Sequence, residues 1–134
     1  MDPLSITTGV VGLLSSLTTL SIRINEFRKD VKNATTETSQ LTQEVDGLTV
    51  ILKRLDETRG SLNLPNNLAN ELGSILQASN RSVIEIELFL KRVSSKRFPG
   101  PYWAFSGKSE CQKHCRSLES YKSTLNVTLT LSSM

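Results

Sequence analysis

Histidine and cysteine are scarce in this sequence of 134 residues. His114 is the single histidine, and Cys111 and Cys115 are the two cysteines. A structural zinc ion usually takes four His or Cys ligands, so these three would need carboxylates or a second chain to complete a site. Two cysteines one helical turn apart would form a strained disulfide. The sequence therefore excludes a disulfide-stapled mini-protein, and we expect no metal ion or other cofactor.

Catalytic motifs are missing as well. The sequence contains no GxSxG, no Gly-rich phosphate loop, no HExxH and no paired Glu-x-x-His. The cluster of Cys111, His114 and Cys115 raises the question of a metal or redox site. Both cysteines fall on apolar positions of a helical pattern, however, where free cysteine packs as a small hydrophobic residue. We interpret the cluster as part of the core and expect that the chain is not an enzyme.

Charge is absent from the first part of the chain, since no charged residue lies between Asp2 and Arg23. About 20 residues are enough to cross a bilayer. A secretory signal begins with positive charge and ends at a cleavage site, whereas this stretch begins with Asp2 and continues into an amphipathic pattern. Serine and threonine dilute its apolar residues. We expect neither a signal peptide nor a permanent transmembrane helix here.

Length and net charge indicate one mildly basic domain spanning residues 1–134, large enough to bury its own core. The net charge is +3, from 16 Lys and Arg against 13 Asp and Glu. No helix-turn-helix, zinc finger or aromatic RNA-binding motif accompanies this small excess. Nucleic acid is therefore not an expected partner.

Apolar residues recur every three or four positions in four segments, which predicts four amphipathic helices. The first two seams are Val10, Leu13, Leu17, Leu20, Ile24, Phe27 and Val31, then Leu41, Val45, Leu48, Leu52 and Leu55. The other two are Leu68, Leu72, Ile75, Ser79, Val83, Ile86, Leu90 and Val93, then Cys111, Cys115, Leu118, Tyr121 or Lys122, Leu125 and Leu129. The expected helices span about residues 3–32, 36–58, 65–96 and 107–131. We predict an all-α, antiparallel up-and-down bundle of four main helices.

Helix ends and connections can also be predicted. Asp2-Pro3 is a suitable start for the first helix, in which a bend is expected, if anywhere, near Gly9 or Gly12. Asn33 with Thr35 or Thr36 would cap the second helix, and Gly60 would end it.

The segment Phe98-Pro99-Gly100-Pro101 is expected to stop any helix. The aromatic residues in and after it are predicted to plug one end of the core; they are Phe98, Tyr102, Trp103 and Phe105. Ser106 or Gly107 would then cap the last helix.

Two features of the sequence suggest membrane contact. On a helix, Ser5, Gly9, Gly12 and Ser16 form small-xxx-small pairs, which either let helices approach closely in lipid or ease packing of the first helix in its own bundle. Candidate contacts for anionic lipid headgroups follow the uncharged stretch; they are Arg23, Arg28, Lys29 and Lys32. A second basic group flanks the Pro-Gly connector; it comprises Lys91, Arg92, Lys96, Arg97 and Lys108. Both groups can also be interpreted as solvated helix faces.

The beginning and the end of the chain together resemble a known family. The first 14 residues, MDPLSITTGVVGLL, resemble the MDPLSxxxGVxGLL opening of fungal N-terminal domains attached to STAND receptors and ankyrin-repeat proteins. Residues from Trp103 through LESYKSTL to Leu129 resemble the closing pattern of those domains, and Val45 to Leu55 fits the middle pattern. The resemblance covers nearly the entire chain, and the group is the HeLo-like class, similar to the HeLo domain of fungal incompatibility proteins.

This resemblance implies a helical bundle that acts in regulated cell death. In such domains an activating receptor or amyloid-type signal oligomerises the bundle, and the N-terminal helix is delivered from the cytoplasm to the plasma membrane. The matching positions here are Leu4, Ile6, Gly9, Val10, Gly12, Leu13, Leu14 and Leu17. The implied partners are further copies of the chain, anionic membrane lipids, and an upstream receptor or further domains outside this chain. The alternative is a soluble homotypic or adaptor domain of a fungal NLR-like receptor with no membrane activity.

Overall fold

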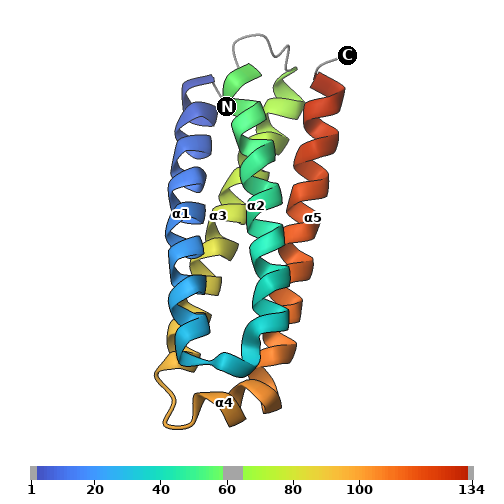
Figure 1. The fold of residues 1–134 in the computed structure, drawn as a ribbon. Coiled ribbons are helices and arrows are strands. Elements are labelled where there is room, and N and C mark those ends of the chain that lie inside the picture. The colour runs from blue at the N-terminus through green and yellow to red at the C-terminus, as the bar shows by residue number, and fades with distance from the viewer. Residues whose placement is uncertain (1–2, 59–64, 133–134) are drawn as a thin grey trace.

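Four long helices make up the fold. The computed structural model describes residues 3–58 and 65–132, and these residues form helices and no strand (Figure 1). The long helices are α1 (Pro3–Asp30), α2 (Thr35–Thr58), α3 (Asn66–Ser94) and α5 (Lys108–Ser132). The short helix η1 (Lys32–Ala34) joins α1 to α2, and α4 (Pro99–Tyr102) and η3 (Trp103–Gly107) lie between α3 and α5. The predicted all-α bundle of four main helices is confirmed.

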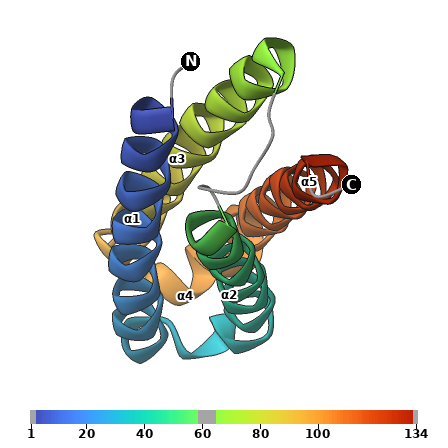
Figure 2. The same cartoon turned by 90° about the horizontal axis from the view of Figure 1, so that it is seen from above.

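Consecutive long helices alternate in direction, but they are not all neighbours. Seen from above, the order around the bundle is α1, α2, α5, α3 (Figure 2). The helices α1 and α3 run in the same direction, so Gly9 lies beside Leu76 and Ser16 beside Asn80. Antiparallel packing therefore holds for α1 with α2 and for α3 with α5, whereas α1 with α3 and α2 with α5 are parallel pairs.

The predicted seams form the core. Every residue of the first two seams is buried, with at most 3% of its surface exposed. Along α3 and α5 the pattern holds less strictly, because Leu68, Ile75, Cys115 and Leu129 are only half-buried. In addition, Leu76 and Phe89 are buried although they lie beside the predicted α3 seam. The broader buried stripe of α3 follows from its contacts with both α1 and α5.

The boundary between the first two helices differs from the prediction. The helix α1 runs without a break past Gly9 and Gly12 and ends at Asp30, because Val31 leaves helical geometry at φ −128° and ψ 83°. Lys32 therefore belongs to η1, and α2 begins at Thr35 directly after it. Asn33 does not cap α2, since its amide donates to the Gly100 carbonyl at 3.2 Å. Thr35 donates to the Lys32 carbonyl instead. The proposed cap Asp2 and stop Gly60 lie outside the described residues.

The Pro-Gly-Pro segment begins a helix rather than stopping one. The helix α3 ends at Ser94, two residues before its predicted end, and Pro99 occupies the first turn of α4. Proline is tolerated there because the first amides of a helix have no partner within it. Helical geometry continues through the π turn of η3 into α5, so Ser106 and Gly107 are not caps. A Cβ on Gly107 would lie 2.8 Å from the Trp103 ring, so close packing of this ring explains why glycine occupies the position.

One of the four aromatic residues at this end closes the core. Trp103 is 1% exposed and lies between Phe27 of α1 and Phe89 of α3, at centroid distances of 5.3 and 6.1 Å. Tyr102 is half-buried. By contrast, Phe98 is 64% and Phe105 92% exposed. The prediction of an aromatic plug is therefore correct for Trp103 and wrong for the two phenylalanines, which α4 and η3 place on the outer side of the chain.

Candidate functional site

The apolar residues of α1 that we predicted to enter a membrane lie mostly in the core. Ile6, Val10, Leu13 and Leu17 are at most 5% exposed, and Leu14 is half-buried against the core. The side chain of Leu4 lies outside the described part of the structure. In this arrangement the first helix presents its apolar seam to α2 and α3. Any use of that seam outside the bundle would require α1 to separate from both helices.

The two glycines of α1 face different surroundings. A Cβ on Gly9 would lie 3.3 Å from Cδ1 of Leu76, so this glycine allows close packing of α1 on α3. A Cβ on Gly12 would meet nothing within 4 Å. The Ser16 hydroxyl lies 2.8 Å from Oδ1 of Asn80 on α3. Packing in the bundle thus accounts for Gly9 and Ser16 but leaves Gly12 on an open surface.

Helix α1 meets the length and composition expected of a membrane span. Among the described residues, Ile6–Asp30 is the one helix that is long enough and contains an 18-residue stretch apolar enough, with a mean hydropathy of 1.2 over that stretch. Only 28% of the stretch is buried in the bundle. Three of its hydroxyls have an acceptor in the helix itself, since Ser16, Thr18 and Thr19 lie 3.0–3.2 Å from the carbonyl oxygens four residues before them, although Ser16 lies closer to Asn80. Such bonds satisfy hydroxyl groups without water.

The four predicted lipid-binding cations divide into two kinds. Arg23 pairs with Glu26 at 3.2 Å on the same helix. Arg28 reaches across to α2, where Nε donates to Thr38 and Nη2 donates to Thr42, both at 3.0 Å. Lys29 and Lys32, in contrast, are exposed at the end of the bundle. Arg28 therefore holds α1 to α2, Arg23 is exposed but paired, and the two lysines are exposed with no ion pair found among the described residues.

The role of Arg28 can be tested by unfolding. Replacement by alanine should lower the free energy of unfolding by about 1–2 kcal/mol, because charge-assisted hydrogen bonds to half-buried hydroxyls are lost. Lys29→Ala, one residue away, should change it by less than about 0.5 kcal/mol. Urea titration followed by circular dichroism measures both values. Equal effects of the two variants would show that Arg28 is a surface charge like its neighbour.

The cluster of Cys111, His114 and Cys115 lies on α5. Cys111 is fully buried, and its hydrogen bond with Cys115 together with burial raises the pKa of the thiol. His114 packs on the Phe89 ring at 5.2 Å, and burial lowers its pKa. Within residues 3–58 and 65–132, no three His, Cys, Asp or Glu side chains gather closely enough to hold a metal ion. Cys111 packs as the core residue that the pattern predicted, whereas Cys115 and His114 border it.

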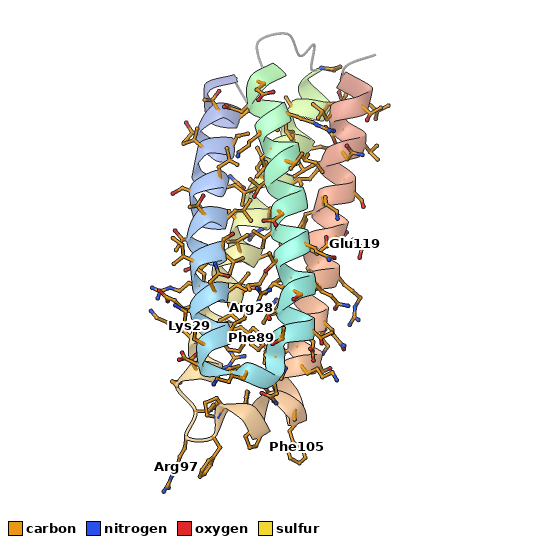
Figure 3. The ribbon with its side chains drawn as sticks, in the orientation of Figure 1. Arg28, Lys29, Phe89, Arg97, Phe105 and Glu119 are labelled. Carbon is orange, nitrogen blue, oxygen red and sulfur yellow. The ribbon has the colours of Figure 1, made fainter. Side chains whose placement is uncertain are left out.

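Sequence reasoning identified the cations of one further surface but missed its exposed aromatic residues. At the end of the bundle that carries α4, exposed Phe98 and Phe105 lie on the same connection as Lys96 and Arg97. Figure 3 shows Arg97 and Phe105 at this end. The signal was available, because the sequence has no carboxylate between Glu87 and Glu110. The clustering of aromatic residues predicts a core position for both phenylalanines, whereas their exposure depends on the helical geometry of α4 and η3.

Comparison with known proteins identifies a family for the whole chain. Residues 1–134 match the family PigL_N, described as pigment biosynthesis cluster protein PigL N-terminal. Searches of the curated proteins and of the solved structures gave no match. The family is fungal, which agrees with the fungal N-terminal domains that the two ends of the chain resemble. The chain therefore belongs to the PigL_N family of fungal N-terminal domains.

Proposed function

We propose that this domain is a non-enzymatic signalling module of fungal cell death, which oligomerises on activation and targets membranes through α1. It would reside in the cytoplasm and move to the plasma membrane when an upstream receptor or further domains activate it. Its partners would be further copies of the chain and anionic lipids. The observation that carries the proposal is the combination, on α1, of a span-length apolar helix and an unpacked glycine at position 12.

Gly12 supports the oligomerisation step. Glycine in a helix interior costs about 1 kcal/mol relative to alanine. The space beside Gly12 is empty, so alanine would fit without a clash. Packing within the bundle therefore offers no reason for this cost. A small residue on an exposed helix surface lets a second helix approach closely, as in membranes.

The local hydrogen bonds of α1 support its transfer into lipid. Each unsatisfied polar group in a bilayer costs several kcal/mol. The hydroxyls of Ser16, Thr18 and Thr19 already have acceptors in their own helix. The helix would therefore carry these three side chains into the bilayer with a smaller penalty than composition alone indicates.

Burial of the α1 seam sets the condition for activity. Val10, Leu13 and Leu17 are at most 1% exposed in the bundle. Entry of α1 into a bilayer therefore requires its release from α2 and α3, and the activating signal must favour the released state. The resting bundle would then store the helix without exposing its apolar seam.

Dye release from vesicles tests this function. The 134-residue chain, fused to a chemically induced dimeriser, is added to vesicles containing phosphatidylserine. Wild type should release dye on dimerisation, and Gly12→Leu should slow release by about tenfold or more, because the leucine keeps helices apart. Thr18→Leu is the matched control, since Thr18 is exposed on another side of α1, and it should behave as wild type.

Two results would count against the proposal. Equal dye release by Gly12→Leu and wild type would remove the glycine from the mechanism. Self-association of wild type without any dye release would favour the alternative, a soluble homotypic or adaptor domain.

A further inference from the structure

A second surface with the chemistry of membrane contact lies at the end of the bundle that carries α4. We call it the basic tip, and it comprises Lys29, Lys32, Lys96, Arg97, Phe98 and Phe105. Two separate parts of the chain meet here, because Asn33 of η1 donates to the carbonyl of Gly100 in α4 at 3.2 Å. Figure 3 shows Arg97 and Phe105 projecting from this end, away from the four long helices.

The basic tip carries uncompensated positive charge. Of the basic residues near the connector, Arg92 pairs with Glu110 at 2.6 Å and Lys108 lies 3.7 Å from the Glu37 carboxylate. No ion pair found between described residues involves Lys29, Lys32, Lys96 or Arg97. Asp30 is the one carboxylate between Arg28 and Thr36. Exposed cations therefore outnumber carboxylates at this end of the bundle.

Exposed phenyl rings accompany this charge. Phe105 is 92% and Phe98 64% exposed, the two highest values among the large apolar side chains that the structure describes. The Arg97 guanidinium lies 5.6 Å from the centre of the Phe98 ring, and the Lys96 ammonium lies 4.8 Å from that of Tyr102. Aromatic rings and long cationic side chains side by side are the combination found at membrane–water interfaces, where rings enter the headgroup region and cations meet phosphates.

We propose that the basic tip docks the folded bundle, end-on, onto bilayers that contain anionic phospholipids. Phe98 and Phe105 enter the boundary between headgroups and acyl chains, while Lys29, Lys32, Lys96 and Arg97 contact the headgroups. Complementary charge identifies the occupant, because a bilayer offers both an anionic surface and an apolar layer directly beneath it.

Docking by the tip goes beyond the function proposed for α1 and does not depend on it. The 28 residues of α1 span about 40 Å, so its first turn lies at the opposite end of the bundle. End-on docking leaves the α1 seam buried. It brings the folded domain to the membrane before α1 leaves the bundle, and release of α1 is a separate, later step.

Vesicle co-sedimentation tests the contribution of each kind of residue. Wild type should bind vesicles of phosphatidylcholine with phosphatidylserine and not those of phosphatidylcholine alone, without dye release. Lys96→Gln with Arg97→Gln should weaken binding about thirtyfold, and Phe98→Ser with Phe105→Ser by about tenfold or more. Lys113→Gln with Arg116→Gln controls for charge lost elsewhere on the surface, and Val127→Ser with Leu131→Ser controls for apolar surface lost elsewhere. Each of these double variants should change binding less than about threefold.

Fluorescence of Phe105→Trp tests insertion directly. The emission of the added indole should shift to shorter wavelength on vesicles with phosphatidylserine and should be quenched by brominated lipid. Trp103 is buried and contributes a constant signal. Gly12→Leu should give the same shift, so a failure of the α1 mechanism and a failure of docking can be told apart. Three results would each overturn the proposal: no binding by wild type, equal binding by wild type and the Phe98/Phe105 variant, or an indole that brominated lipid does not quench. The first result would leave an acidic protein as the partner of the tip.

Discussion

Replacement of Trp103 by alanine should lower the free energy of unfolding by about 3–5 kcal/mol, the range for removal of a large aromatic side chain from a core. The indole is 1% exposed and lies against Phe27 and Phe89, which belong to α1 and α3. Its loss leaves a cavity where these two helices meet η3. Because native domains are stable by only about 5–15 kcal/mol, this single change should leave the bundle near its unfolding threshold at 37 °C.

Matched variants separate packing from loss of an aromatic residue. Phe105→Ala removes a ring that is 92% exposed and should change stability by less than about 0.5 kcal/mol. Gly107→Ala should destabilise although it adds only a methyl group, because its Cβ would lie 2.8 Å from the Trp103 ring. Guanidinium titration followed by circular dichroism measures all three. If Trp103→Ala cost no more than Phe105→Ala, Trp103 would not be the residue that closes this end of the core.

A disulfide between α1 and α3 should abolish dye release while leaving docking by the tip intact. A Cβ placed on Gly9 lies 3.7 Å from the Cβ of Leu76, within the range of about 3.5–4.5 Å that disulfides require. Gly9→Cys with Leu76→Cys, once oxidised, would hold α1 on the bundle. We expect dye release to fall about a hundredfold or more on oxidation and to return with dithiothreitol.

The locked variant has internal controls. The reduced form carries the same substitutions, so it accounts for the loss of the Leu76 side chain from the core. Peptide mapping must show that the bridge joins positions 9 and 76, because Cys111 and Cys115 are also free thiols. Co-sedimentation with phosphatidylserine vesicles should be the same in both forms. Unchanged dye release on oxidation would mean that α1 acts without leaving α3.

The functional residues were only partly predictable. The sequence located the apolar residues of α1 and the two basic groups, yet it did not distinguish Arg28, which donates to hydroxyls on α2, from exposed Lys29. Both are cations on neighbouring positions of one helix, and only the packing of α2 against α1 separates their roles. The cations of the basic tip were located, but its exposed phenylalanines were missed, since the clustered aromatic residues were expected to plug the core.

Sequence periodicity by itself determined which face of α1 and of α2 is buried, because a three-four spacing aligns apolar side chains along one side of any helix. The seam from Val10 to Val31 needed no tertiary information. Only the tertiary structure decided which helices are neighbours, because an apolar seam indicates that a helix face is buried but not which helix packs against it. It placed α1 beside α3 in parallel, filled the space at Gly9 with Leu76 and left that at Gly12 open. It also turned Phe105 outward, because the start of α4 at Pro99 sets the rotation of every residue after it, and it left Phe98 exposed just before that start.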